Sequence, residues 1–391
     1  MKKNTLIFLY PYRFRTFDRK RFEIPCLKES FDIEIFELIE YLHPKFCISY
    51  MTQDKSEDIK RFDNFTNFKD SFEELLKETG DRVYVLNFIP VTNFRELKVN
   101  NFLRSKSLRT IAFNNPGVPP IIASSSVFEN ISLKLGFMKN RGTIKLFVNL
   151  FIEFTVRLIS SLNKVKPDFL ISAGSIYTKD IKNEILGNSF DYNTFLELEK
   201  NPKSQKKYIV FLDTGSPYFN TDTLLRQTKK PHSIEKWYPA LRKFFDQIEE
   251  LLDMPVLILA HPKHKYTDKD KQKTFGDRKV IHGKTPEMIQ NSSLVLATNS
   301  TAVSFAVLAK LPICILRSDE ICRDKYMNSY LDSSSINLGC PIVNIDNQFH
   351  FSKSFFTKVD HKLYDLYVKK FLSSRDDEKT LCQIFREEFN N

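Results

Sequence analysis

Glycine and cysteine are scarce in this chain of 391 residues, and each scarcity excludes a class of protein. The 10 glycines and 17 prolines are too few for long disordered or low-complexity stretches. Two glycine-rich phosphate-binding signatures, G-x-G-x-x-G and the Walker loop, are absent from the sequence. The six cysteines form no CxxC pair and no closely spaced set. This distribution suits a reducing cytoplasm and predicts no metal site.

The sequence also lacks a hydrophobic run long enough to span a membrane. Its longest apolar region, residues 144–159, is interrupted by Lys145, Glu153 and Arg157, whereas a spanning helix needs about 20 apolar residues. Pro11 and Arg13 end the short amino-terminal run, which therefore predicts a first β-strand rather than a signal peptide. We expect a cytoplasmic protein that is soluble or peripheral on the inner membrane.

What is abundant is positive charge, with a net value of +11. Because the lysines are dispersed along the chain, the charge indicates a solvated surface. Alternatively, the positive charge could attract the protein to anionic lipid headgroups or polyanionic glycans. A nucleic-acid-binding protein would interleave basic and aromatic residues along one stripe. The sequence shows no such stripe, so no nucleic-acid partner is expected.

Alternating strand and helix signals predict an α/β protein. Residues 1–180 form the predicted amino-terminal Rossmann-like domain, which would bind the acceptor. A long helix over 143–165 ends before Lys166-Pro167, and the strand after it leads into the loop Ala173-Gly174-Ser175. This loop is interpreted as an acceptor-site element or hinge, or simply as a tight turn. The predicted strands are short apolar runs, as in sheets covered on both faces: 5–10, 33–38, 82–88, 108–113 and 168–172.

The second half of the chain repeats this organisation. Residues 181–206 are polar, and their apolar residues recur at neither the helical nor the strand spacing. This pattern predicts an interdomain linker. Residues 207–350 form the predicted donor domain, with strands at 208–212, 256–260, 279–282 and 294–298 and a helix over 234–253. Residues 351–391 are predicted to be helical, over 359–372 and 376–389.

Polar residues follow four of these strands at the point where ligands bind in open α/β sheets. In His261-Pro262, the proline favours an extended histidine backbone, which projects the imidazole from the strand end. There the imidazole can contact a phosphate and neutralise a departing nucleotide, or it can simply cap a carbonyl. Lys263 follows in the same loop.

Two strand-to-helix junctions complete the predicted nucleotide site. At Gly283-Lys284-Thr285-Pro286-Glu287, Thr285 is a predicted N-cap with proline at N1, and the turn would hold base and ribose. Glu287 would accept ribose hydroxyls, although the helix dipole alone accounts for an acid there. At Asn299-Ser300-Thr301, hydroxyl groups and exposed N–H groups would bind a phosphate without a metal ion.

Asp213 follows the strand at 208–212 and precedes Gly215. A carboxylate at a strand end is a candidate general base for a sugar hydroxyl, and the alternative is an Asx turn that closes the loop. Asp268-Lys269-Asp270 matches the metal-binding DxD pattern, but its lysine-rich surroundings indicate a solvated charged loop.

These motifs resemble bacterial GT-B glycosyltransferases that use CMP-activated acidic sugars, the sialyltransferase-like proteins of surface-carbohydrate biosynthesis. The resemblance covers mainly residues 207–320 and depends on Asp213-Thr214-Gly215, His261-Pro262 and Ser300-Thr301. It implies two Rossmann-like domains with a cleft between them and carboxyl-terminal helices that pack back on the amino-terminal domain. It further implies that Asp213 is the general base, that His261 assists CMP departure and that Ser300 and Thr301 bind the phosphate. Thr214 departs from the family's second acidic position.

The predicted function is metal-independent, inverting transfer of a nonulosonic acid or Kdo-type sugar from a CMP donor to a glycan or lipid-linked glycan, as in lipopolysaccharide or capsule synthesis. No cofactor is expected. The alternatives are a GT-B transferase that uses a UDP-sugar, a GDP-sugar or a CDP-polyol, and a non-catalytic glycan- or nucleic-acid-binding protein.

Overall fold

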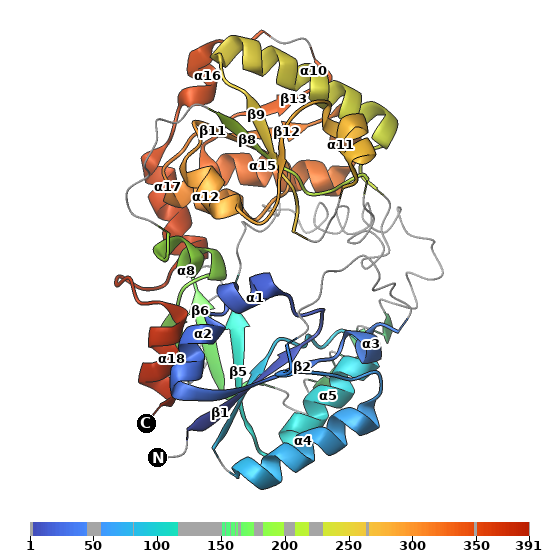
Figure 1. Cartoon of the computed structure of the whole chain (residues 1–391), viewed down its shortest axis with the longest axis vertical. Helices are drawn as coiled ribbons and strands as arrows, with labels where there is room; N and C mark the ends of the chain where they lie inside the picture. Colours follow the sequence, from blue (N-terminus) through green and yellow to red (C-terminus); the bar gives the residue numbers. More distant parts are fainter. Residues whose placement is uncertain are drawn as a thin grey trace. The chain divides into compact units, whose positions relative to one another are not determined.

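The chain divides into two compact units. A computed structural model describes residues 3–44, 56–80, 82–115, parts of 151–162, 166–175, 183–198, 208–218, 230–262, 266–347 and 350–390. Unit 1 comprises Met1–Asn115, Ile144–Asn193 and Ser373–Asn391, and unit 2 comprises Pro116–Thr143 and Thr194–Leu372. Figure 1 shows a strand-and-helix layer structure in each unit. The prediction of two α/β units is confirmed.

Unit 1 is built on a parallel sheet of seven strands in the order β3-β2-β1-β4-β5-β6-β7. Parallel strands that are buried on both faces are near-continuous apolar runs. Strand β1 fits this rule, because the last six of its seven residues are buried. The strands are β1 (Asn4–Tyr10), β2 (Phe31–Glu37), β3 (Ile59–Arg61), β4 (Val83–Asn87), β5 (Arg109–Asn114), β6 (Phe169–Ala173) and β7 (Glu184–Gly187).

Helices cover both faces of this sheet. On one face, Phe68 and Phe72 of α4 (Phe65–Thr79) pack in a core with Val99 of α5 (Phe94–Ser105). On the other, α2 (Ile24–Ser30) and α18 (Leu381–Phe389) share a core with Phe190 of α8 (Phe190–Leu196), and α1 (Thr16–Arg21) contacts α2. The short α3 (Ile39–Leu42) follows β2. Of the long helix predicted at 143–165, the described residues between 151 and 162 are helical, and the remainder lies outside the described residues.

Unit 2 contains a parallel sheet of six strands in the order β10-β9-β8-β11-β12-β13. The predicted helix at 234–253 is α10, and its Trp237, Phe244 and Phe245 are buried. The strands are β8 (Ile209–Leu212), β9 (Val256–Leu259), β10 (Val280–Ile281), β11 (Leu294–Ala297), β12 (Ile313–Arg317) and β13 (Ile342–Asn344). The helices are α10 (Ile234–Leu252), α11 (Asp268–Phe275), α12 (Thr285–Gln290), α13 (Val303–Leu308), α14 (Asp319–Arg323), α15 (Lys325–Leu338), α16 (Lys353–Thr357) and α17 (His361–Tyr367).

The range 181–206, predicted to be a linker, contains regular structure. Residues Glu184–Gly187 form β7 beside β6, and α8 follows. With only four residues and one exposed leucine, β7 leaves no periodic signal in the sequence. Residues 199–207 lie outside the described residues.

The carboxyl-terminal segment is shared between the units. α16 and α17 belong to unit 2, whereas α18 belongs to unit 1. The expectation that terminal helices pack back on the amino-terminal domain is therefore met by α18. In Figure 1, α18 lies beside α2.

A disulfide joins these two helices. Cys26 of α2 is bonded to Cys382 of α18, with 6.2 Å between their Cα atoms. The sequence-based expectation of unpaired cysteines is therefore wrong for these two residues. Their separation of 356 residues explains the error, because only the folded chain brings them together.

Candidate functional site

The donor-site residues predicted in unit 2 lie at one edge of its sheet. The register pairs Leu212 with Leu259 and with Ala297, and Leu259 with Ile281. The carboxyl ends of β10, β9, β8 and β11 are therefore adjacent. The loops that leave these four strands contain Gly283, His261, Asp213 and Asn299, respectively, so one sheet edge holds all the predicted donor motifs.

Asp213 is almost completely buried at the end of β8, with 5% of its surface exposed. One carboxylate oxygen accepts the backbone N–H of Gly215 at 2.8 Å, and the other accepts the hydroxyl of Tyr266 at 2.9 Å. The first bond is an Asx turn, and Gly215 accommodates it with φ of +73°. Both oxygens of the predicted base are therefore engaged within the protein.

The Asp213 carboxyl is shifted toward its neutral form. Burial raises its pKa from 3.8 to about 6, and hydrogen bonds from Gly215, Tyr266 and the backbone N–H of His261 offset only part of that rise. Asp213 thus links the loop after β8 with the loop after β9. The bond from Gly215 matches the Asx-turn alternative, in which Asp213 closes its own loop.

Two tyrosines near Asp213, Tyr218 and Tyr266, were not predicted from the sequence. Burial, and then the adjacent Asp213 carboxylate, raise the pKa of Tyr266, so its hydroxyl remains a donor. Tyr218 packs on Tyr266 with ring centroids 5.8 Å apart, and its hydroxyl donates to Asp270. A tyrosine in a polar loop has no periodicity to mark it as buried, so only the fold reveals this cluster.

His261 lies directly after buried Ala260 and is half-buried. Its neighbour Pro262 is exposed, and Lys263 lies outside the described residues. His261 therefore lies at the carboxyl end of a central strand, as the sequence predicts, and the projection of its imidazole toward the sheet edge stays a prediction.

The turn after β10 differs in detail from the prediction. Lys284, not Thr285, is the N-cap of α12, and no side chain caps the helix there. Thr285 and Pro286 occupy the first two helical positions. Proline is tolerated in the first turn because the N–H group that it lacks would have no partner within the helix. Gly283 has φ of +71°, and Glu287 lies half-buried in the first turn.

At the junction after β11, the predicted phosphate-binding residues form a compact turn. The Thr298 hydroxyl donates to the Asn299 side chain at 3.2 Å, and Ser300 Oγ accepts the N–H of Ala302 at 3.3 Å. Asn299 and Thr301 are exposed, whereas Ser300 is half-buried. The turn therefore presents one amide and one hydroxyl group outward, ahead of α13.

Asp268 and Asp270 belong to the first turn of α11 rather than to a loop. Asp270 completes a capping box with Thr267, while Asp268 is exposed and pairs with Lys271 at 2.8 Å. Acidic residues are favoured there by the helix dipole, which accounts for the DxD pattern without a metal.

In unit 1, the sequence predicts that the acceptor enters near the residues at and just past the end of the first strand, Tyr10, Tyr12, Arg13 and Arg15, and most of these are engaged in local structure. Arg13 pairs with buried Glu37, Arg15 pairs with Asp18 at 2.8 Å, and Tyr10 donates to Asp18. Tyr12, 42% exposed, stacks on His43. Of the predicted loop Ala173-Gly174-Ser175, Ala173 is the last residue of β6, and Gly174 after it has φ of +77°.

Metal-ligand geometry occurs once among the described residues, at Glu23, Cys26 and Cys382 of unit 1. The disulfide consumes two of those three donors. None of the described helices combines the length and the apolarity needed to cross a bilayer.

The arrangement of two parallel α/β units is found in known structures. No protein-family model and no curated protein sequence matches the chain. The wall teichoic acid polymerase TagF superposes with a TM-score of 0.52 at 12% identity, over 100% of this chain and 89% of that one. The chain has the GT-B fold.

Two further structures show weaker likeness. The UDP-GlcNAc 2-epimerase of Methanocaldococcus jannaschii has a TM-score of 0.48 at 12% identity, with 98% of each chain covered. Acinetobacter baumannii MurG has a TM-score of 0.41 at 10% identity, covering 99% of this chain and 95% of that one.

Proposed function

We propose that this protein is a metal-independent, inverting glycosyltransferase that moves a nonulosonic acid or Kdo-type sugar from a CMP donor to a surface glycan. The observation that supports this most is that His261 and the pair Asn299 and Thr301 lie at the same sheet edge of unit 2, after β9 and β11, the two strands that flank β8. The GT-B fold supports a nucleotide-activated donor at that edge, since open α/β sheets bind ligands outside the carboxyl ends of their strands.

The chemistry of this edge suits a leaving group with a single phosphate. An imidazole at His261 and the outward hydroxyl of Thr301 supply hydrogen bonds to a phosphate as negative charge develops on it. Asp270 is engaged with Thr267 and Tyr218, so the DxD pattern offers no free acidic pair for a metal–diphosphate complex. Both features support CMP over a nucleoside diphosphate.

Asp213 has two proposed roles that differ in their chemistry. As a general base it would deprotonate the acceptor hydroxyl, as the family resemblance implies. As a positioning residue it would hold the His261 loop through the hydrogen bonds that it accepts. We favour positioning, because a base must reach a substrate proton and both Asp213 oxygens face protein donors.

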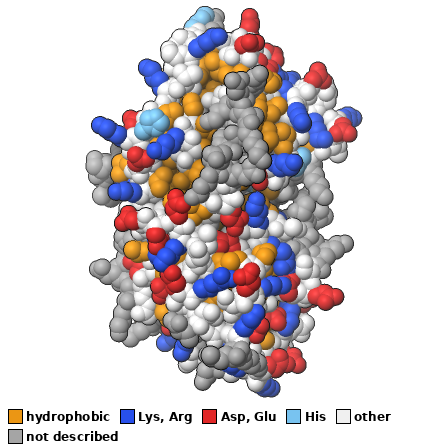
Figure 2. Space-filling model, turned by 60° about the vertical axis from the view of Figure 1, so that its left-hand side comes forward, with side chains coloured by type: hydrophobic (Ala, Val, Ile, Leu, Met, Phe, Trp, Pro, Cys, Tyr) orange, Lys and Arg blue, Asp and Glu red, His pale blue; other side chains and the backbone are white. Residues whose placement is uncertain are grey.

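The surface charge gives little support to a nucleic-acid-binding function. Figure 2 shows lysine and arginine side chains interspersed with acidic ones on the face in view. A binding module for nucleic acid would gather basic residues along one path.

Nucleotide-dependent thermal unfolding tests the proposed donor. CMP should raise the unfolding temperature more than UMP, UDP or GDP, because cytidine and a single phosphate match the proposed site. At about 100 times its dissociation constant, CMP would add roughly 2.7 kcal/mol to the free energy of unfolding. EDTA should leave this stabilisation unchanged.

The other outcomes discriminate among the alternatives. Greater stabilisation by UDP or GDP would replace the CMP donor by a nucleoside-diphosphate sugar, and greater stabilisation by CDP would favour a CDP-polyol. Stabilisation by single-stranded RNA alone would contradict a transferase. Thr301→Ala should weaken the CMP effect, and Thr357→Ala, at the end of α16, serves as the control threonine substitution.

A further inference from the structure

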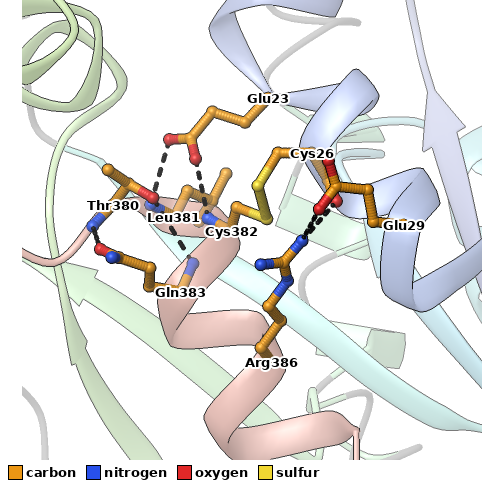
Figure 3. The surroundings of a disulfide bond; sticks show 8 residues. All are labelled: Glu23, Cys26, Glu29, Thr380, Leu381, Cys382, Gln383 and Arg386. Atoms are coloured by element: carbon orange, nitrogen blue, oxygen red, sulfur yellow. Dashed lines mark hydrogen bonds and ion pairs between the residues drawn. A yellow bond between two sulfur atoms is a disulfide. The ribbon is translucent and has the colours of Figure 1, made fainter.

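The Cys26–Cys382 pair lies in unit 1, whereas the proposed donor residues lie in unit 2. Figure 3 shows the bond between α2 and the first turn of α18. The sequence between the two cysteines includes the whole of unit 2, so the bond closes a loop around nearly the entire chain. A covalent link at this point ties the last helix of the protein to its first residues.

Contacts that do not involve sulfur hold the two cysteines together. The Glu23 carboxylate accepts the backbone N–H groups of Leu381 at 3.1 Å and Cys382 at 3.0 Å. Arg386 donates to the carbonyl of Cys26 at 3.1 Å and pairs with Glu29 at 2.5 Å. Because these contacts and the apolar face of α18 remain when the bond is broken, the thiols stay adjacent and the bond can form again.

The two cysteine residues differ in exposure to solvent. Cys382 is fully buried, and Cys26 is half-buried. A small molecule in solution would therefore meet Cys26 before Cys382. Among the other described cysteines, Cys314 and Cys340 are buried, and Cys322 is half-buried but not in a disulfide. Cys322 thus matches Cys26 in exposure while lacking a cysteine partner.

We propose that Cys26 and Cys382 form a reversible redox modification site whose oxidant is a low-molecular-weight disulfide of the glutathione type. The Cys26 thiolate attacks one sulfur of the oxidant, forming a mixed disulfide and releasing one thiol. The Cys382 thiolate then attacks Cys26 Sγ, which forms the internal disulfide and releases the second thiol. The protein loses two electrons and two protons, and the oxidant, reduced to two thiols, takes up both.

The site acts by tethering α18 to α2. In the oxidised protein the carboxyl-terminal helix is covalently fixed to unit 1, and in the reduced protein only noncovalent contacts hold it. Cross-linking two residues so far apart in sequence restricts the unfolded chain strongly. The oxidised form should therefore unfold at a temperature about 5 °C or more above that of the reduced form.

Trapping the intermediate tests the assignment. After reduction and exposure to oxidised glutathione, Cys382→Ser should accumulate one glutathione adduct, located at Cys26 by peptide mass spectrometry. The wild-type protein should lose two free thiols without retaining an adduct at either position. Cys26→Ser should acquire no adduct at Cys382, and Cys322→Ser, the control, should behave as the wild type does.

Several results would overturn the proposal. They are an unmodified Cys26 in Cys382→Ser, a stable adduct on Cys26 in the wild type, or equal unfolding temperatures for the oxidised and reduced wild type. A zinc ion that copurifies with the reduced protein and blocks oxidation would also overturn it, since the thiols would then be metal ligands. Alkylation of free thiols after denaturation shows whether Cys26 and Cys382 are oxidised or reduced, even in a variant of low stability.

Discussion

Replacing His261 with alanine is expected to reduce transfer from a CMP-activated acidic sugar by about a hundredfold or more, with the unfolding temperature almost unchanged. Removing one preorganised hydrogen-bond donor from a developing charge costs about this much in other enzymes. The affinity for CMP should fall less than the transfer rate, because the charge on the phosphate grows in the transition state. Initial-rate kinetics of CMP release, with CMP binding by calorimetry, measure both quantities.

His282 provides the matched control for this prediction. It follows the adjacent strand β10 and is exposed, so His282→Ala removes a strand-end imidazole without touching the proposed phosphate contact. We expect near-normal transfer from it. Equal activity in His261→Ala and His282→Ala would reduce His261 to a structural role, such as capping a carbonyl.

Replacing Asp213 with asparagine is expected to remove a pH-dependent part of the free energy of unfolding. The folded pKa of about 6 lies above the ordinary value of 3.8 because the carboxyl is buried. Its contribution to stability is therefore fully present below about pH 4 and is lost as pH rises through 6. Relative to Asp213→Asn, the wild type should lose roughly 2 kcal/mol between pH 4 and pH 7.

Urea unfolding at several pH values measures this difference in the free energy of unfolding. A second variant, Tyr266→Phe, keeps the Asp213 carboxyl but removes one of its hydrogen-bond donors. The Tyr266 hydroxyl lowers the Asp213 pKa, so Tyr266→Phe should shift the loss of stability to higher pH. If the free energy of unfolding of the wild type changed with pH in parallel with that of Asp213→Asn, the raised pKa of the buried Asp213 carboxyl would be contradicted. Complete loss of transfer in Asp213→Asn with unchanged CMP binding and stability would support the general base instead.

The strands that the sequence predicted are those with continuous apolar runs. The runs in β1, β4, β8, β9 and β11 are unmistakable because both sheet faces bury their side chains. The strands β3, β7 and β13 were missed, since they have only three or four residues and include half-buried or exposed positions. Short edge strands depend on the neighbour that pairs with them, and this information is not local in sequence.

The site was predictable in position but not in its contacts. Strand ends located His261, Asp213 and Asn299, because parallel strands bring their carboxyl ends to one edge. The partner of Asp213, Tyr266, lies 53 residues away in sequence, and the partner of Cys26 lies 356 residues away. Contacts at such separations are set by the register of the sheet and the packing of α18, which no sequence motif records.

The most direct test of the donor site is hydrogen–deuterium exchange with and without saturating CMP. The loops after β8, β9, β10 and β11 meet at one edge of unit 2, so a nucleotide bound there should slow amide exchange in several of them at once. We predict slower exchange at residues 260–262, 283–287 and 298–303, with exchange in the unit 1 sheet unchanged. Slower exchange confined to unit 1, or none at any of these loops while CMP is bound, would contradict the proposed site.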